Sequence, residues 1–466
     1  MRYCGFSEEF HDAGIAFIRD GNIEFATNGE RYSKKKNDPF LPQELHDMIK
    51  PTDHVTFFED YSIRRKYDIL PKIEPRVRRP FDAFTQHHVS HAASGYYTRP
   101  WTSKEDTVMM TIDGAGEYQT SCIYDHNFNL LSEHVMPKSI GYFYTYTTRY
   151  LGLRPLEDEY VVMGLAAYGK PIVGKEMIEF YNQVENNTLD EKLNLKDGTR
   201  TEIYGHLKDL YRGLSDSDIA ASCQYFAEIE ILNRAKEARK YGSKLIYAGG
   251  CAQNVIANSK IKLLFDDVWI PPACTDAGSA LGAAAYSYGK ELNWNGPYLG
   301  YNIKRDISPK EVVRHLLRHR YCGVANGRAE YGPRALGNRS LIADPRFDVK
   351  STVNKVKKRQ KYRPFGPAIL EEFADQYFEG PMNEYMQYAC DAKHDFKSVT
   401  HIDGTARVQV VKPDCTSIFR KILEEFYEQT GVPMLLNTSL NIRGRPIVNN
   451  EKDAQIFQHQ YGVRVF

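Results

Sequence analysis

Short apolar runs that end at glycine-rich turns are the feature that most restricts the fold of this chain. Residues 13–18 and 23–27 flank a turn at Gly21, which is typical of a β-hairpin. The apolar runs at 108–112 and 244–248 also end at glycines, and the second of them leads into a segment of helical pattern. Alternation of strands and helices predicts an α/β architecture.

The length of the chain predicts more than one domain. At roughly 150 residues per domain, 466 residues correspond to about three domains or lobes. A turn-rich stretch with little periodicity falls at 293–300, so we place the main boundary at about residue 300. We therefore expect one domain over 1–300 and another over 301–466, and the sequence shows no internal repeat.

Composition excludes several classes of protein. The chain has 61 Lys and Arg against 60 Asp and Glu, so coating of nucleic acid by bulk positive charge is excluded, although a local basic groove is not. No apolar run approaches the roughly 18 residues of a membrane-spanning helix, and the acidic first ten residues do not fit a signal peptide. The eight cysteines are scattered without a C-x-x-C pair, which is typical of reduced thiols and predicts a cytoplasmic protein.

Three of the 14 histidines fall within five residues. On a helix, His87 and His91 lie on one face and can bind one metal ion, whereas His88 points elsewhere. A packed helix with coincidental histidines is the alternative. Asp276, at a later strand-to-helix turn, is either part of a helix cap or the carboxylate that completes a set of metal ligands with the two histidines.

Two glycine turns that follow predicted strands could hold phosphate groups through backbone N–H groups. Their candidate residues are Asp113, Gly114, Gly116, Gly249, Gly250 and Asn254. An ordinary Asp-Gly hairpin and a plain strand-to-helix turn are the alternatives for the two segments.

Three segments of the second half place Arg, Lys, Ser and Asn among glycines and prolines. They span residues 327–340, 356–365 and 436–444. Guanidinium groups bind phosphate and carboxylate oxygens in a bidentate manner, and rigid turns beside them favour a shaped anion pocket over a solvated face.

These motifs together resemble a known family. The sequence is similar, nearly from end to end, to the O-carbamoyltransferases of the nodulation and antibiotic-tailoring type. The most specific pieces of the resemblance are the His-His-x-x-His-Ala motif at 87–92, the Gly-Pro-Arg-Ala-Leu-Gly-Asn-Arg-Ser motif at 332–340 and Arg-Pro-Phe-Gly-Pro at 363–367. The resemblance implies a TsaD-like domain of the actin-like ATPase superfold, with two lobes, followed by a YrdC-like α/β domain.

The resemblance also implies a reaction. Family members use ATP, with Mg, and carbamoyl phosphate to make carbamoyl-adenylate in the YrdC-like domain, with loss of pyrophosphate. The intermediate moves to the TsaD-like domain, where a metal ion, iron or zinc, helps to deliver the carbamoyl group to an acceptor hydroxyl.

Matching the motifs residue by residue implies three groups of site residues. The metal ligands would be His87, His91 and Asp276. The two glycine turns named above would form the nucleotide side of the transfer site. The carbamoyl phosphate and adenylate site would use Lys357, Arg359, Ser439, Asn441, Arg334 and Arg339. We add the hypothesis that His88 takes the proton of the attacking hydroxyl. The chain departs from the family pattern at Val161, where a lysine is usual, and at Gln360, where a glutamate is frequent.

The acceptor is open between two classes. Family acceptors include hydroxyls of sugars and antibiotics, and viral members carbamoylate 5-hydroxymethylcytosine in DNA, in which case the chain would work in a host cytoplasm. Two basic stretches support a DNA acceptor: Lys34, Lys35 and Lys36, and the series Arg64, Arg65, Lys66, Lys72, Arg76, Arg78 and Arg79. A solvated surface is the alternative for these charges. The related tRNA threonylcarbamoyl transfer and a nucleotide-binding module without turnover are alternative functions.

Overall fold

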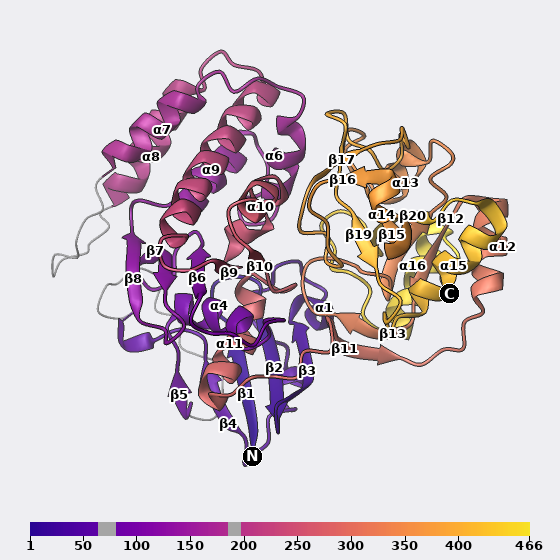
Figure 1. The fold of residues 1–466 in the computed structure, drawn as a ribbon, viewed down its shortest axis with the longest axis horizontal. Helices are drawn as coiled ribbons and strands as arrows, with labels where there is room; N and C mark the ends of the chain where they lie inside the picture. Colours follow the sequence, from indigo (N-terminus) through magenta and orange to yellow (C-terminus); the bar gives the residue numbers. More distant parts are fainter. Residues whose placement is uncertain (64–80, 185–196) are drawn as a thin grey trace. The chain divides into compact units, whose positions relative to one another are not determined.

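The chain folds into two compact units. The computed structural model describes residues 1–63, 81–184 and 197–466. The N-terminal unit comprises Met1–Gly29 and Asn37–Trp294, and the C-terminal unit comprises Glu30–Lys36 and Asn295–Phe466 (Figure 1). The structure thus divides the chain between residues 294 and 295, where the sequence predicted about 300. The sequence did not predict that the short segment Glu30–Lys36 groups with the C-terminal unit.

The first sheet of the N-terminal unit has the strand order β3-β2-β1-β4-β5. Its strands are β1 (Arg2–Ser7), β2 (Gly14–Arg19), β3 (Asn22–Asn28), β4 (His54–Phe57) and β5 (Ala83–Phe84). The first three strands form an antiparallel meander, and β4 and β5 continue the sheet parallel to β1. The predicted hairpin at Gly21 is the β2–β3 connection.

The second sheet repeats this topology. Its order is β10-β9-β6-β7-β8. The strands are β6 (Thr107–Ile112), β7 (Gln119–Tyr124), β8 (Leu130–Val135), β9 (Lys244–Ala248) and β10 (Asp267–Trp269). Again three strands form an antiparallel meander and two continue in parallel. Two such sheets are the two lobes of an actin-like ATPase fold, which confirms the predicted fold class.

Two helices occupy equivalent places in the two halves of this duplication. Helix α4 (His87–Tyr96) follows β5, and α11 (Asp276–Tyr288) follows β10. The two helices pack against each other. A Cβ atom on Gly282 of α11 would lie 1.7 Å from the carbonyl oxygen of Ser90 on α4, so only glycine allows this approach. The small-residue sequence of α11 therefore fixes the contact between the helices.

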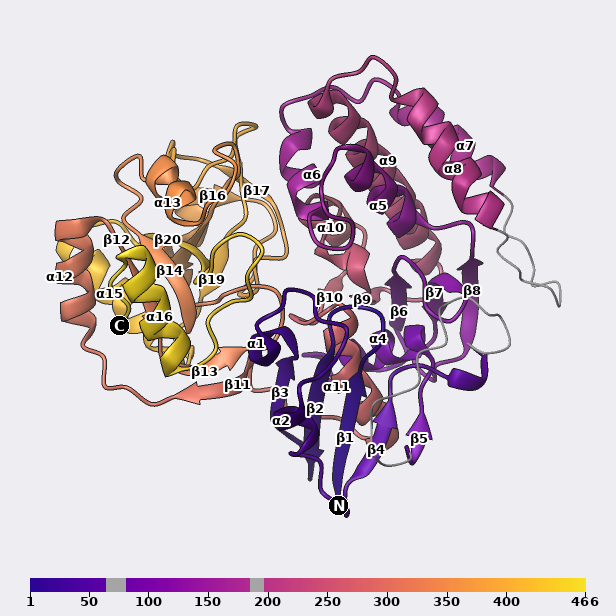
Figure 2. The same ribbon diagram turned by 180° about the vertical axis from the view of Figure 1, so that it is seen from behind.

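The remaining helices of this unit form a layer around one long helix, α9 (Asp216–Ala238). They are α5 (Ile140–Tyr150), α6 (Glu159–Ala166), α7 (Gly174–Gln183), α8 (Asp197–Leu210) and α10 (Val255–Lys262). Two short helices lie outside this layer: α2 (Gln43–His46), and α1 (Glu30–Ser33), which groups with the C-terminal unit. Figure 2 shows α5 and α10 in front of α9. Most of the described residues of 174–240 are helical.

The C-terminal unit is built on a five-stranded sheet of order β12-β14-β20-β15-β19. Its strands are β12 (Tyr321–Ala325), β14 (Arg339–Ala343), β15 (Gly366–Leu370), β19 (Gln409–Val411) and β20 (Met434–Ser439). One face packs on α12 (Pro309–His319) and α15 (Ile418–Thr430), and the other on α13 (Lys350–Val356) and α16 (Glu451–Tyr461). The likeness of this unit to YrdC stays a prediction.

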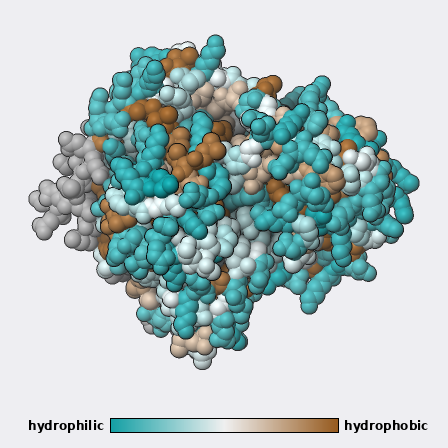
Figure 3. Space-filling view, in the orientation of Figure 1, coloured by the Kyte–Doolittle hydropathy of each residue, from teal (hydrophilic) through white to brown (hydrophobic). Residues whose placement is uncertain are grey.

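Smaller elements complete the C-terminal unit: β11 (Tyr298–Ile303) pairs with β13 (Gly327–Glu330), and β16 (Phe378–Glu379), β17 (Cys390–Ala392) and β18 (Thr405–Ala406) form a third sheet beside α14 (Ala374–Tyr377). On the face drawn in Figure 3, hydrophilic residues predominate and hydrophobic ones occur in small groups between them. Among the described helices, none combines the length and apolar character needed to cross a membrane.

Candidate functional site

Four metal-binding side chains meet in the N-terminal unit. His87 and His91 lie one turn apart at the start of α4, as their spacing predicted. Asp113 follows directly after β6, and Asp276 is the first residue of α11. One ligand atom from each of these side chains lies within 4.8 Å of every other, and we refer to the four as the His/Asp cluster.

The ligand atoms of the His/Asp cluster face one another. The Nε2 atom of His91 lies 3.1 Å from Nε2 of His87, 3.2 Å from Oδ2 of Asp113 and 3.3 Å from Oδ1 of Asp276. Within the part of the chain that the structure describes, Oδ1 of Asp276 is buried and accepts no hydrogen bond. Two imidazole nitrogens and two carboxylates that converge in this way suit a divalent iron or zinc ion.

Further side chains contact the Nδ1 atoms of the two histidines, on the side of each ring away from the other ligands. Oε1 of Glu59 lies 3.1 Å from Nδ1 of His87, and Oγ of Ser279 lies 3.1 Å from Nδ1 of His91. Such partners fix the ring orientation of metal-binding histidines. Burial alone would lower the pKa of His87, but the hydrogen bond to Glu59 and the charge of Asp276 outweigh burial and raise it to about 10. The side chains around His87 therefore favour positive charge at this place.

Asp113 connects the His/Asp cluster to the predicted nucleotide-binding turns. Its Oδ1 accepts a hydrogen bond from the backbone N–H of Gly114 (2.6 Å), and its Oδ2 accepts one from Gly250 (2.7 Å). Gly249 has φ +95°, and a Cβ atom there would lie 2.3 Å from the carbonyl oxygen of Ile112. The sequence predicted that Asp113 lies on the nucleotide side or holds a cation or a metal-bound water. The structure places its carboxylate among the metal-ligand candidates, with the glycine turns beside them.

Gly116 and Asn254 have roles that the sequence did not indicate. A Cβ atom on Gly116 would lie 2.8 Å from Cβ of His87, so the glycine lets the loop between β6 and β7 approach α4. The Asn254 side chain accepts a hydrogen bond from the N–H of Ala257 (3.1 Å) and exchanges hydrogen bonds with Gln224. Asn254 is therefore the cap of α10, and its amide is already engaged within the protein.

His88 does not fit the predicted role of general base. It is completely buried, and its Nδ1 lies 2.8 Å from Oγ1 of Thr111. Burial and the neighbouring His87 and His91 lower its pKa to about 3. An enclosed imidazole of such low basicity is a weak base toward an entering hydroxyl group, so the geometry disfavours this role, which stays a prediction.

His11 is a residue of this site that the sequence reasoning missed. Its Nε2 lies 3.5 Å from Oδ2 of Asp276, and its side chain remains 20% exposed. The neighbouring Asp12 accepts a hydrogen bond from Oγ1 of Thr275 (2.6 Å), which ties the loop to the start of α11. His11 lies 76 positions before His87 in the sequence, and no local pattern links it to the histidine motif.

In the C-terminal unit, Lys357 joins residues that the sequence predicted to act together. Its ammonium group donates hydrogen bonds to the carbonyl oxygen of Ser439, to Oγ of Ser439 (3.3 Å) and to Oδ1 of Asn441 (2.9 Å). Burial, followed by the charges of Arg359 and Arg363, lowers the pKa of Lys357 well below its usual range. Positive charges are thus crowded around this lysine.

Arg407 extends the crowding of positive charge. Burial and the charges of Arg334, Arg359 and Arg363 lower its pKa well below the ordinary value for arginine. We refer to Lys357 and these four arginines as the cationic cluster. Arg407 stands in an unremarkable segment of the sequence, and only folding reveals its place beside the predicted residues.

Arg339 differs from the other predicted anion ligands. It is completely buried, and its three guanidinium nitrogens donate to backbone carbonyl oxygens. The acceptors lie 2.8 to 3.1 Å away and belong to Asn449, Asn326, Gly327, Asn338 and Tyr301. Arg339 therefore holds the backbone together, and its predicted contact with carbamoyl phosphate is corrected.

Two departures from the family pattern also have positions in the structure. Val161 is buried in α6, so its side chain belongs to the core and not to a phosphate site. Gln360 has a buried side-chain oxygen without a hydrogen-bond partner among the described residues.

The basic stretches proposed for DNA are only partly described. The seven positions from Arg64 to Arg79 lie outside the described residues. Lys34 forms an ion pair with Asp453 (2.5 Å) and Lys36 one with Glu30 (2.8 Å), both within the C-terminal unit. Two of the three positive charges of the first stretch are therefore paired with acids.

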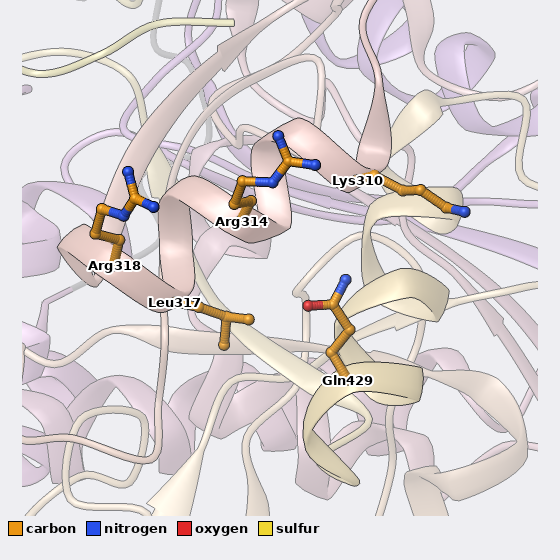
Figure 4. A pocket seen from close by; sticks show the side chains of 5 residues that line it. All are labelled: Lys310, Arg314, Leu317, Arg318 and Gln429. Carbon is orange, nitrogen blue, oxygen red and sulfur yellow. The ribbon is translucent and has the colours of Figure 1, made fainter.

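A separate hollow on the C-terminal unit contains none of the predicted site residues. It has a volume of about 430 Å³ and lies between α12 and α15. Lys310, Arg314, Leu317, Arg318 and Gln429 line it, as Figure 4 shows.

Comparison with known proteins identifies the family. The family model "Carbamoyltransferase N-terminus" matches residues 59–285, and "Carbamoyltransferase C-terminus" matches 313–465. Nodulation protein U of Sinorhizobium fredii is 33% identical over 96% of this chain and 94% of its own length. Nodulation protein NolO of Bradyrhizobium diazoefficiens is 33% identical over 79% of this chain and 75% of its own length.

Likeness to solved structures is weaker. The activator of the 2-hydroxyisocaproyl-CoA dehydratase from Clostridium difficile aligns with 62% of this chain and 95% of its own, at 14% identity and a TM-score of 0.37. The fold assignment therefore rests on the strand order of the two sheets. The two family models and the nodulation relatives, in contrast, cover most of the sequence and confirm the family predicted from its motifs. The chain therefore belongs to the carbamoyltransferase family and is a carbamoyltransferase.

Proposed function

We propose that this carbamoyltransferase makes carbamoyl-adenylate from ATP and carbamoyl phosphate in its C-terminal unit and transfers the carbamoyl group to a hydroxyl in its N-terminal unit. The observation that carries the proposal is the cationic cluster, in which burial and the charges of neighbouring arginines lower the pKa of Lys357 and Arg407. Two polyanionic substrates would relieve this repulsion when they bind. Making an adenylate from them requires such compensation of negative charge in the transition state.

The residues of the C-terminal unit divide this task. The ammonium group of Lys357 is held by Ser439 and Asn441, which fixes its position before a substrate arrives. The planar guanidinium groups of Arg334, Arg359 and Arg407 suit bidentate contact with phosphate oxygens. We assign the ATP with its Mg and the carbamoyl phosphate to this cluster.

The transfer step belongs to the His/Asp cluster. His87, His91, Asp113 and Asp276 would hold an iron or zinc ion, which supplies a Lewis acid that polarises the carbamoyl carbonyl. The N–H groups of Gly114 and Gly250 hold the Asp113 carboxylate in place. His11, which is partly exposed and lies 3.5 Å from Asp276, takes the proton of the attacking hydroxyl at its imidazole.

A first experiment tests the enzyme with its two proposed substrates. We expect the purified full chain to release pyrophosphate from ATP only when carbamoyl phosphate is present, and the variant Lys357→Met to lose this release. Lys355→Met, two residues earlier on α13, is the matched control. Absence of pyrophosphate release from the wild-type chain would refute the adenylate step.

A second experiment identifies the acceptor, which we propose is either a hydroxymethylated base in DNA or a hydroxyl of a sugar or other small molecule. Hydroxymethylcytosine DNA, ordinary DNA and a panel of aminoglycoside and oligosaccharide hydroxyls are offered in parallel. Mass spectrometry then reads the gain of about 43 Da expected when a hydroxyl acts as the nucleophile. A gain on hydroxymethylcytosine DNA alone selects the first acceptor, and a gain on a small molecule alone selects the second.

A further inference from the structure

Helix α5 has one face that the core does not use. Its residues Phe143, Tyr144, Thr147 and Thr148 are buried. Tyr142, Tyr146 and Arg149 lie at spacings of four and three residues, so they share a second face. The two tyrosines are partly exposed and the arginine is exposed.

Aromatic rings form a row on this second face. The ring centroids of Tyr142 and Tyr146 are 6.0 Å apart, with an angle of 23° between the ring planes. Tyr204 of α8 continues the row, 6.1 Å from Tyr146. The guanidinium carbon of Arg149 lies 5.6 Å from the centroid of the Tyr204 ring. We call Tyr142, Tyr146 and Tyr204, with Arg149 at the far end, the aromatic row.

The aromatic row begins beside the His/Asp cluster. Ser139, the cap of α5, donates a hydrogen bond to the carbonyl oxygen of Gly114 (2.6 Å). A Cβ atom on Gly141 would lie 2.8 Å from the carbonyl oxygen of Asp113, so the helix start packs tightly on this turn. The ring of Tyr142 lies 3.6 Å from the place that a Cβ atom on Gly114 would take. The first ring is therefore adjacent to a candidate metal ligand.

We propose that the aromatic row binds a nucleic-acid acceptor as a single strand, with bases stacked on the tyrosines and a backbone phosphate on Arg149. Single-stranded nucleic acid is bound by this combination of aromatic faces and positive charge, because every base has a face that can stack. The exposed guanidinium group of Arg149 lies over the Tyr204 ring and forms no ion pair among the described residues, so it can also contact an anion. A neutral sugar could also stack on the tyrosine rings, but it carries no negative charge for Arg149 to bind.

This inference rests on the proposed function, since the stacked strand would present its reactive hydroxyl to the His/Asp cluster. It narrows the acceptor from any hydroxyl to one carried by a nucleotide. It does not depend on the basic residues from Arg64 to Arg79, which the structure does not describe.

Binding of a labelled single-stranded oligodeoxycytidine to the full chain tests the inference by fluorescence anisotropy. We expect Tyr146→Ala and Tyr204→Ala to weaken binding by about 5- to 100-fold each, the loss typical for one stacked base. Tyr146→Phe keeps the ring and should bind like wild type. Tyr241→Ala is the matched control, because Tyr241 is 46% exposed and has no part in the row. Arg149→Gln should reduce the salt dependence of binding.

Three outcomes would overturn the inference. They are failure of the wild-type chain to bind the oligonucleotide, unchanged binding by both alanine variants, and binding by the row of a neutral oligosaccharide in place of the oligonucleotide. Pyrophosphate release from ATP and carbamoyl phosphate, measured on the same preparations, reports separately on the proposed function. Its retention without oligonucleotide binding would refute the aromatic row alone, and its absence from wild type would refute the proposed function.

Discussion

Arg31 and Gly332 are joined by a hydrogen bond across 301 positions of sequence, 3.3 Å from Nη2 to the carbonyl oxygen. The same nitrogen donates to the carbonyl oxygen of Glu330 at 3.3 Å, and the Arg31 side chain is almost completely buried. Gly332 stands two residues before Arg334 of the cationic cluster. The segment Glu30–Lys36, which comes from the first tenth of the chain, therefore supports the loop that carries this arginine.

We expect Arg31→Ala to lower the free energy of unfolding by about 1–3 kcal/mol, because two buried carbonyl groups lose a charged donor. The looser loop should also raise KM for carbamoyl phosphate in the pyrophosphate assay more than it lowers kcat. Denaturant unfolding and initial rates provide the two measurements. Lys35→Ala, at an exposed position of the same segment, should leave both unchanged. Wild-type values for Arg31→Ala would contradict the supporting role.

Removal of the carboxylate behind His87 should weaken metal binding. We expect Glu59→Gln to lower the affinity for iron or zinc by about 10–100-fold, the usual effect of losing a carboxylate that orients a histidine ligand. Titration against a coloured chelator measures this affinity. Glu44→Gln, on the exposed side of α2, serves as the control. Metal removal by a chelator should stop carbamoyl transfer and leave pyrophosphate release intact.

Substitution of His11 should affect the transfer rate, whereas substitution of His88 should affect the stability of the fold. In single turnovers from preformed carbamoyl-adenylate, His11→Gln should slow transfer by about 10²–10⁴-fold, the range for a lost general base. His88→Gln should transfer at a rate near wild type but unfold at lower denaturant concentration, because His88 is buried and bonded to Thr111. A rate loss confined to His88→Gln would restore the role predicted from the sequence.

Arg407 and Arg339 should respond in opposite directions to replacement by methionine. Arg407→Met removes a charge that its neighbours repel, so we expect the free energy of unfolding to rise by about 1 kcal/mol while pyrophosphate release is lost. Arg339→Met removes a donor to five carbonyl groups and should cost about 3 kcal/mol or more. Thermal unfolding with a parallel activity assay distinguishes the two. Equal destabilisation by both substitutions would contradict the division of roles.

Acid should destabilise the N-terminal unit partly through His134 on β8. Burial, with the charges of Arg234 and Lys138, lowers its pKa from 6.5 to about 3. Between these values the unfolded chain binds a proton that the folded chain does not, so stability is complete above about pH 6.5 and falls as the pH drops. His134→Asn should reduce the slope of unfolding free energy by up to about 1.4 kcal/mol per pH unit in this range. Urea unfolding at pH 4 to 7 measures the slope, and an unchanged slope would contradict the assignment.

Local patterns predicted most of the elements and part of the site. The spacing of His87 and His91 set their common face, and glycines marked the ends of β6 and β9. The duplication of the sheet could not be predicted from the sequence. The two sheets share a strand order without a repeated sequence, and strand order depends on pairing between segments that are distant in the chain. The grouping of Glu30–Lys36 with the C-terminal unit was also not predicted, because it too depends on contacts between distant segments.

Roles of individual charged residues were harder to predict than their positions. Arg334 and Arg339 stand in one motif and look alike in the sequence, yet one lies in the cationic cluster and the other is enclosed by carbonyl groups. His88 stands between two metal-ligand candidates and points into the core. Burial decides between these roles, and burial is a property of the tertiary structure.

The equivalence of α4 and α11 has a thermodynamic consequence. The two helices descend from matching positions in matching sheets, but one brings two imidazoles and the other a carboxylate. His87, His91 and Asp113 lie on elements that pack on the second sheet, whereas Asp276 begins a helix that packs on the first, so a bound ion would join the two halves through Asp276. Its binding free energy would then add to the cohesion of the lobes, by about 2.7 kcal/mol at a hundredfold excess over Kd. Opening of the lobes would withdraw Asp276 from the ion, so opening and loss of ion affinity would be coupled.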